Sequence, residues 1–133
     1  MEIVPFRRRL FYAPLCEILT KHGHPVPSED EIPAVGWVAM NNEYIVAIGF
    51  LRRMEGNHAL LDGLTTNPEA SPEARHLGLT GVVTALIKSA KELKIRQIVA
   101  YTLDESVVKR ALVHGFSTTQ HKTLVLTVHA GQS

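Results

Sequence analysis

The sequence predicts an α/β (α+β) fold in which helices pack on a mixed, mostly antiparallel sheet with a central parallel pair. Two observations predict it. The first half contains three successive strand-like segments separated by short turns, which indicates an antiparallel meander. The second half alternates helical and strand-like patterns, which favours two parallel strands joined by a crossover helix. The expected element order is β-α-β-β-β-α-β-α-β.

Length and composition indicate an ordinary globular protein. The 133 residues suit one domain, and we expect residues 1–133 to form a single one. A hydrophobic content of 45% is sufficient for a core, and a net charge of +1 argues against a general nucleic-acid binder. No stretch approaches the roughly 18 apolar residues of a membrane span, and residues 1–10 lack the apolar core of a signal peptide.

Cysteine and histidine usage bears on location and metal binding. The single cysteine, Cys16, permits no disulfide within the chain and no thiolate zinc site, which favours a reducing cytoplasm. His22 and His24 are the closest histidine pair, but no acidic or sulfur ligand stands beside them. We therefore expect no metal site.

The first elements follow from local patterns. Residues 2–6 alternate as an edge strand does, and Pro5 is tolerated there. Residues 10–19 have helical spacing, and Gly23 marks the end of that helix. The proline-rich and acidic segment 24–33 is typical of a surface loop.

The meander is expected over residues 35–40, 44–52 and 59–66, with turns at 41–42 and 56–57. Residues 77–93 then change to a period near 3.6, which predicts an amphipathic helix. Residues 95–102 are apolar and predict a strand buried on both faces, parallel to the last strand of the meander.

The C-terminal part completes the pattern. Asp104 or Ser106 caps a second helix, which runs to about His114. Residues 116–129 are strongly β-forming and supply one or two strands.

The most informative stretch joins the meander to the long helix. It consists of Leu64-Thr-Thr-Asn-Pro68, a short loop, and Arg75-His-Leu-Gly-Leu-Thr-Gly81, which we expect to open the helix. Such a junction is an anion site in principle, because free N–H groups and the positive end of the helix dipole point to one place. Gly78 and Gly81 would permit close approach of a phosphate. A tight strand-to-helix turn without a ligand is an equally open reading.

With a Gly115–Phe116 pair after the second helix, this order of elements resembles the GNAT superfamily of acyl-CoA-dependent N-acyltransferases over residues 35–128. The family's motif Arg/Gln-x-x-Gly-x-Gly/Ala corresponds to Arg75-His76-Leu77-Gly78-Leu79-Thr80. The resemblance implies that N–H groups of residues 75–81 hold the pyrophosphate of acetyl-CoA. It also implies that the backbone of Leu64, Thr65 and Thr66 pairs with the pantetheine arm and supplies an N–H to the oxyanion.

The sequence departs from the family pattern at three places. Thr80 stands where Gly or Ala is usual, and the loop from Pro68 to Arg75 is longer than usual and contains Pro72. Ala111 occupies the place where many members carry a tyrosine that acts as general acid. This last departure favours an alternative, a catalytically weak or inactive module that binds acyl-CoA or a protein partner.

A base is needed, because an ammonium with a pKa near ~10.4 is not nucleophilic at neutral pH. Asp62 is the candidate, since strand alternation places it on the face of Leu64 and Thr66; a solvated or capping aspartate is the alternative. The reserve candidates are Tyr101, Thr102 and His114. For Tyr101 we expect packing in the sheet, and for His114 a charge at a helix C-terminus.

The function implied is direct transfer of an acetyl group from acetyl-CoA to a primary amine within one ternary complex. The acceptor, a small molecule or a protein lysine or N-terminus, is expected between the first helix, the loop 23–34 and the last strands. The acidic run 28–31 could attract a cationic amine or simply be solvated. The sequence leaves both a monomer and a homodimer open.

Overall fold

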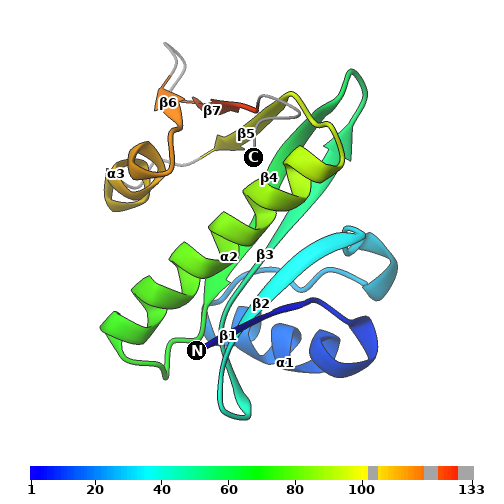
Figure 1. Cartoon of the computed structure of the whole chain (residues 1–133). Coiled ribbons are helices and arrows are strands. Elements are labelled where there is room, and N and C mark those ends of the chain that lie inside the picture. Colours follow the sequence, from blue (N-terminus) through cyan, green and yellow to red (C-terminus); the bar gives the residue numbers. More distant parts are fainter. Residues whose placement is uncertain (102–104, 119–122, 129–133) are drawn as a thin grey trace.

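The computed structural model describes residues 1–101, 105–118 and 123–128. Its first half contains β1 (Glu2–Pro5), α1 (Arg8–Lys21), the short 3-10 helix η1 (Glu29–Glu31), β2 (Val35–Asn41), β3 (Tyr44–Met54) and β4 (His58–Thr66). Its second half contains α2 (Pro72–Glu92), β5 (Gln97–Tyr101), α3 (Glu105–Val113), β6 (Ser117–Thr118) and β7 (Thr123–Thr127) (Figure 1). No helix within these ranges is long and apolar enough to cross a membrane.

One sheet holds all seven strands in the order β1-β2-β3-β4-β5-β7-β6. Every neighbouring pair is antiparallel except β4 and β5, which run parallel. The crossover helix α2 connects these two strands in the sequence. The predicted mixed sheet with a central parallel pair is therefore confirmed. The C-terminal β-forming segment provides two strands, β6 and β7, of which β6 is the edge.

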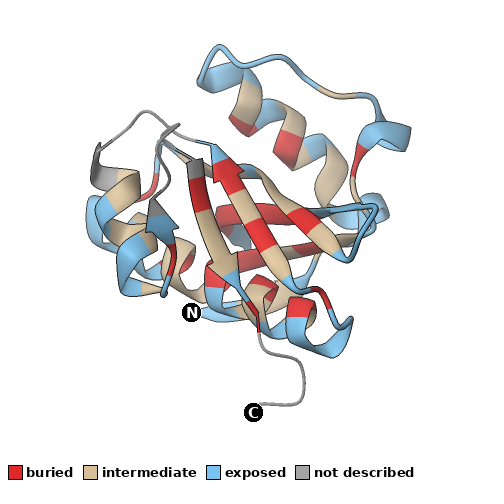
Figure 2. Cartoon of the chain, turned by 90° about the horizontal axis from the view of Figure 1, so that it is seen from above, coloured by how far each residue is buried: buried red, intermediate tan, exposed pale blue. Residues whose placement is uncertain are grey.

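The two long helices cover opposite faces of the sheet (Figure 1). Alternation along β2 sends Val38 into the core with α1 and Ala39 into the core with α2. Buried positions accordingly gather on the central strands, between the helices (Figure 2). A polar contact adds to the packing on the α2 side, where Trp37 Nε1 donates to Ser89 Oγ at 2.8 Å.

Helix α2 begins at Pro72, five residues before the start that the apolar period predicted. The Ser71 Oγ accepts the Ala74 N–H at 3.1 Å, and a proline follows directly at the first helical position. Both are typical of helix starts, because proline lacks the N–H that would otherwise be unpaired there. Residues 75–81 therefore lie inside the helix, and the expectation that they open it is wrong.

The two glycines of this segment face the sheet. A Cβ on Gly78 would lie 2.9 Å from Val46 Cγ1 and 3.3 Å from Ala39 Cβ, and a Cβ on Gly81 would lie 2.5 Å from Ile3 Cδ1. The missing side chains allow α2 to approach β1, β2 and β3 closely. The side of each glycine that lacks a side chain is therefore filled by the sheet, and the expectation that these glycines admit a phosphate stays a prediction.

Candidate functional site

Strands β4 and β5 pair only over their first residues. His58, Ala59 and Leu60 pair with Gln97, Ile98 and Val99. Beyond this point the two strands have no further pairs, so residues 61–66 of β4 have β3 as their strand neighbour. The other edge of this segment is thus available to a ligand that can pair as a strand does, apart from Thr66 O, which bonds to His22 Nε2.

A β-bulge sets the direction of the side chains on β4. One residue of β3, Gly49, lies opposite two residues of β4, Gly63 and Leu64, and Gly63 adopts a positive φ of 60°. The extra residue shifts the alternation by one, so Leu61 and Leu64 both face the α2 side. Asp62 lines a cavity on the α1 side instead. The prediction that Asp62 shares a face with Leu64 is therefore wrong.

A cleft of about 510 Å³ opens where β4 and β5 part. It lies between β4, the first turns of α2, the end of β5 and α3, and two histidines that follow α1 also line it. Its apolar lining consists of Leu61, Leu64, Pro72, Leu79, Val83, Ala100, Val107, Ala111, Phe116 and Leu124. The volume and this lining suit a small organic ligand or cofactor.

The polar lining of the cleft is dominated by basic groups. These groups are His22, His24, Arg75, His76, Arg110 and His114. No carboxylate is among the described residues that line the cleft. Cations from α2 and α3 thus face a common space, together with histidines that follow α1, and this arrangement favours an anionic ligand.

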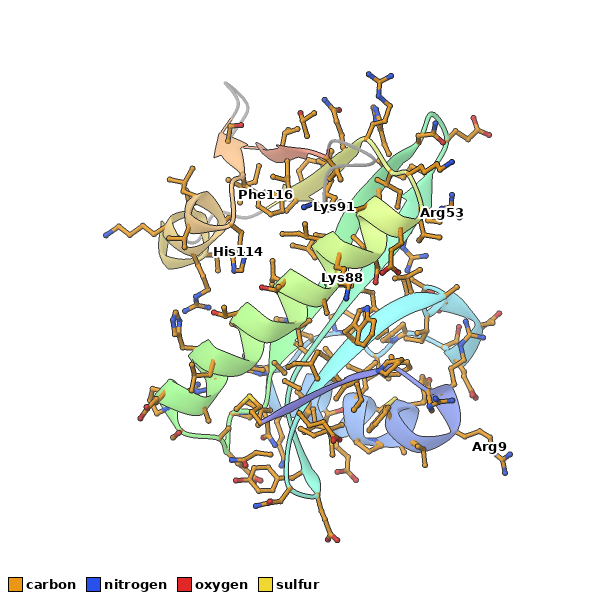
Figure 3. The ribbon with its side chains drawn as sticks, viewed as in Figure 1. Arg9, Arg53, Lys88, Lys91, His114 and Phe116 are labelled. Atoms are coloured by element: carbon orange, nitrogen blue, oxygen red, sulfur yellow. The ribbon has the colours of Figure 1, made fainter. Side chains whose placement is uncertain are left out.

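Two of these groups, Arg110 on α3 and His114 directly after it, interact. Burial and the charge of Arg110 lower the pKa of His114, which favours the neutral imidazole at neutral pH. His114 projects from the side of α3 that faces α2 (Figure 3). Negative charge brought close to Arg110 would offset one of these two causes and raise the pKa of His114.

Arg75 on α2 has an unsatisfied donor. Its Nε atom is buried and has no hydrogen-bond partner in the described part of the chain. A buried donor without a partner costs free energy, and a phosphate oxygen is a strong partner for a guanidinium. The side chain thus fits an anion in the cleft.

The backbone before and at the start of α2 offers few donors. The N–H groups of Asn67, Glu69 and Ala70 bond within the loop or to Val46 O, at 2.8–3.1 Å. The N–H groups of Ala74 and Arg75 bond to Ser71, and Pro68 and Pro72 have none. Deeper in the helix each N–H bonds to the carbonyl four residues earlier. The backbone of this segment therefore offers an anion fewer donors than the basic side chains of the cleft do.

The residues of the predicted cofactor site divide into two groups. Those that line the cleft are Leu64, Thr65, Thr66, Arg75, His76 and Leu79. Those that do not are Leu77, Gly78, Thr80 and Gly81. Leu77 is exposed on the outer side of α2, whereas Gly78 is buried against the sheet. A cofactor-binding role of the lining group stays a prediction.

The residues predicted as catalytic candidates lie in different surroundings. Asp62 Oδ2 accepts a hydrogen bond from Arg52 Nε at 2.8 Å, and its role as base stays a prediction. Tyr101 is 72% exposed, so the expectation that it packs in the sheet is wrong. Thr102 lies outside the described residues. Ala111 lines the cleft, as the resemblance implies for this position.

Sequence reasoning missed Arg110, His22 and His24 as cleft residues. His114 directly follows α3 and stands four residues after Arg110, a spacing close to one helical turn that could have revealed the pair. The histidines come into place because His22 Nε2 bonds to Thr66 O at 2.6 Å, a contact across 44 residues. Within the described ranges, no group of three potential ligands could hold a metal ion.

Comparison with solved structures finds this architecture in acetyltransferases. A GNAT-family acetyltransferase from Staphylococcus aureus Mu50 matches with a TM-score of 0.78 at 17% identity, over 96% of this chain and 99% of that chain. The ribosomal-protein-S18-alanine N-acetyltransferase from Escherichia coli matches with a TM-score of 0.77 at 11% identity, over 99% and 96%. The Mycobacterium tuberculosis protein Rv2747, in complex with CoA, matches with a TM-score of 0.73 at 15% identity, over 90% and 74%. No protein-family model and no curated protein sequence matches the chain.

Proposed function

We propose that this chain, which has the GNAT fold, binds acetyl-CoA in the cleft and transfers its acetyl group to a primary amine. One observation carries the proposal. The cleft combines an unpaired strand edge with a wall of basic side chains, and it lies where two parallel strands part. Acetyl-CoA has the matching parts, namely an amide-bearing arm and a group of phosphates. Two neighbours of this fold, the Mycobacterium tuberculosis protein and an N-acetylglutamate synthase from Neisseria gonorrhoeae, were solved with CoA.

The chain's own residues divide the work of binding. The edge of β4 at Leu64, Thr65 and Thr66 would pair with the amide-bearing arm. Arg75 and Arg110 would bond to phosphate oxygens, since both side chains reach the same cleft from α2 and α3. This arrangement replaces the backbone amides that the start of α2 has already used.

The transfer needs positioning more than acid–base groups. Acetyl-CoA supplies an activated acetyl thioester. The amine nitrogen gives up a proton and bonds to the carbonyl carbon, and the carbon–sulfur bond then breaks to release a thiolate. An N–H on the free edge of β4 would stabilise the oxyanion, and Asp62 or water would accept the amine proton.

A second function is favoured by Ala111, whose methyl group lines the cleft and cannot protonate a thiolate. No tyrosine lines the cleft among the described residues. The chain would then be a module that binds acyl-CoA without efficient transfer. An assay of CoA release with a panel of primary amines separates the two functions, because only the enzyme releases CoA in an amine-dependent way.

We expect acetyl-CoA to stabilise the protein against heat. A ligand that binds only the folded state adds about 2.7 kcal/mol at roughly 100 times its Kd, which raises the melting temperature by several degrees. Scanning fluorimetry with millimolar acetyl-CoA measures the shift, and ATP is the control for phosphate binding alone. An unchanged melting temperature would remove acetyl-CoA from the proposal.

We also expect CoA binding to take up protons near neutral pH. The lowered pKa of His114 keeps its imidazole neutral in the free protein, and phosphates that offset the charge of Arg110 would raise that pKa. Affinity should therefore increase as pH falls through about 6.5, the ordinary histidine pKa. Calorimetry in two buffers of different ionisation enthalpy measures the uptake.

The variant His114→Gln serves as the control, because His22, His24 and His76 also line the cleft and can gain protons. Its proton uptake should be smaller than that of the parent chain. Equal uptake by the two proteins would show that His114 does not respond to the ligand.

A further inference from the structure

A second cavity lies on the other side of β4 from the cleft. Its volume is about 380 Å³, which is within the range of small-molecule sites. Leu15 and Leu19 of α1, Phe50 of β3, and Val26 and Ile32 of the loop that follows α1 supply its apolar walls.

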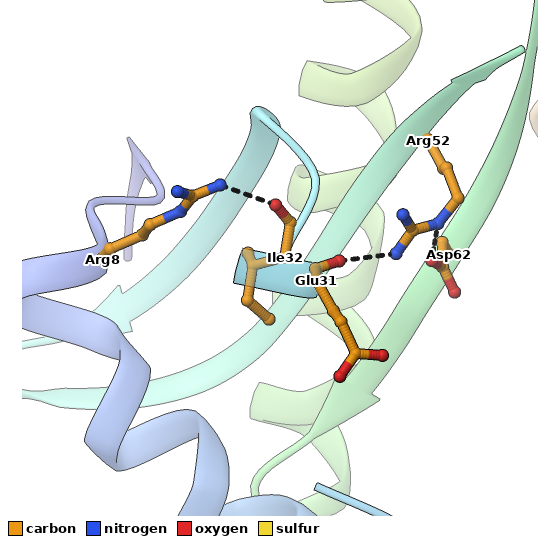
Figure 4. A network of polar contacts seen from close by, with 5 residues as sticks. All are labelled: Arg8, Glu31, Ile32, Arg52 and Asp62. Atoms are coloured by element: carbon orange, nitrogen blue, oxygen red, sulfur yellow. Dashed lines mark hydrogen bonds and ion pairs between the residues drawn. The ribbon is translucent and has the colours of Figure 1, made fainter. Parts of the chain in front are cut away.

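The loop that closes this cavity is held by side chains from two elements. Tyr12 Oη donates to Pro27 O at 2.7 Å, and Arg8 Nη2 donates to Ile32 O at 2.7 Å. Arg52 Nη2 donates to Glu31 O at 2.8 Å from the opposite side (Figure 4). The cavity is therefore preformed, so a ligand need not order the loop to bind.

The polar groups of the cavity are two carboxylates and one guanidinium, from Glu31, Asp62 and Arg52. The guanidinium is engaged, because its Nε donates to Asp62 Oδ2 and its Nη2 to Glu31 O (Figure 4). Hydrogen bonds from Ser28 lower the pKa of Glu31, so its carboxylate is ionised at neutral pH. The cavity thus holds two carboxyl groups against one guanidinium, and this lining favours a cation.

The two cavities share a short piece of β4. Asp62 and Gly63 line the second cavity, whereas their neighbours Leu61 and Leu64 line the cleft. The bulge at Gly63 produces this arrangement, and Gly63 has no side chain to stand between ligands on the two sides. A group bound in the second cavity is thus separated from the cleft by the backbone of β4 at this point.

We infer that the second cavity binds the acceptor, as a small primary ammonium carried on an apolar alkyl or aryl group. This inference rests on the proposed acetyltransferase function. The apolar group packs against Phe50, Leu15 and Ile32, and the ammonium lies at the carboxylates of Asp62 and Glu31. The mixed lining favours acceptors with an apolar group over acceptors without one, because the latter leave the walls of the cavity unfilled.

Three related probes test the inference by binding alone. 2-Phenylethylamine has both features, 2-phenylethanol lacks the charge, and ethylamine lacks the apolar ring. We expect the first to bind at least about tenfold more tightly than either of the others, since each loses one kind of contact. In NMR titrations, 2-phenylethylamine should change the chemical shifts of residues 25–33 and 62–63. Equal affinities, or shifts confined to other regions, would overturn the inference.

Variants separate the charge from the apolar walls. Asp62→Asn should weaken the binding of 2-phenylethylamine about tenfold and leave the binding of 2-phenylethanol unchanged. Val26→Ser should weaken the binding of both compounds. The matched control is Glu55→Gln, an exposed carboxylate outside both cavities. If Glu55→Gln weakens the amine as much as Asp62→Asn does, the recognition is not local and the inference fails.

The acetyl-CoA melting shift distinguishes this inference from the function on which it rests. Acetyl-CoA binding without amine binding would overturn the inference alone. Amine binding in the second cavity without acetyl-CoA binding would overturn the proposed function and leave an amine-binding protein.

Discussion

The double variant Arg75→Gln, Arg110→Gln should bind CoA at least about 100-fold more weakly than the parent chain. Both guanidinium groups line the cleft, and one carries a buried donor without a partner. A hydrogen bond to a charged group contributes about 1.5–3 kcal/mol, and each 1.4 kcal/mol corresponds to tenfold in affinity. Because the backbone amides before α2 are already bonded, few other donors can substitute. Isothermal titration calorimetry at constant salt measures the two dissociation constants.

The matched control is Lys88→Gln, Lys91→Gln. This pair removes the same charge, but both lysines lie in the last turns of α2 and are exposed on its outer side, away from the cleft (Figure 3). The control should change CoA affinity less than about threefold, because exposed charges outside the cleft are screened by salt. If the arginine variant binds CoA as tightly as the parent chain, the phosphates lie elsewhere.

Gly78→Ala should lower the free energy of unfolding by about 1–3 kcal/mol, although alanine is the better helix former by about 1 kcal/mol. The added Cβ would lie 2.9 Å from Val46 Cγ1 and 3.3 Å from the Cβ atoms of Ala39 and Ala47, in a dry contact between α2 and the sheet. Neither Cβ can move without its strand, so the helix must shift. Urea denaturation measures the change, and the folded variant should still bind CoA.

Two variants on the same helix calibrate this result. Gly81→Ala should cost less, because its new Cβ meets the flexible end of the Ile3 side chain. Thr84→Ala, at an exposed position, should be neutral or slightly stabilising. If Gly78→Ala kept full stability and lost CoA binding, Gly78 would lie against phosphate as its motif first suggested.

The element order could be predicted because its signals are local. The turns of the meander, for example, contain Asn42 and Asn57, which both adopt a positive φ near 60°. Asparagine tolerates that conformation better than most residues, so the turns were visible in the sequence. The change from a period of 2 to a period of 3.6 after Thr66 was equally local.

The sequence contains a signal for the start of α2, but the prediction gave more weight to the glycines that follow it. Ser71 and Pro72 are an ordinary signal for the first turn of a helix. The glycines at 78 and 81 favoured a loop there, because a glycine that serves close packing looks the same in a sequence as one that meets a ligand.

Other features of the site depend on distant parts of the chain. The face of Asp62 depends on the bulge, which arises from how Gly49 pairs with β4. The basic side chains of the cleft come from three helical regions that no linear motif connects. The spacing of Arg110 and His114 is the one local pattern in the sequence that indicates them. Local patterns therefore could not predict which cations meet in the cleft.

The short pairing between β4 and β5 also has a consequence for local unfolding. Three residue pairs connect the backbone of the N-terminal strands to that of β5, whereas β3 and β4 pair along most of their length. Breaking so few hydrogen bonds requires less free energy than opening the meander, so this boundary is where the molecule should separate first into cooperative units. A ligand that contacts both β4 and α3 would join those units and slow amide exchange along the boundary.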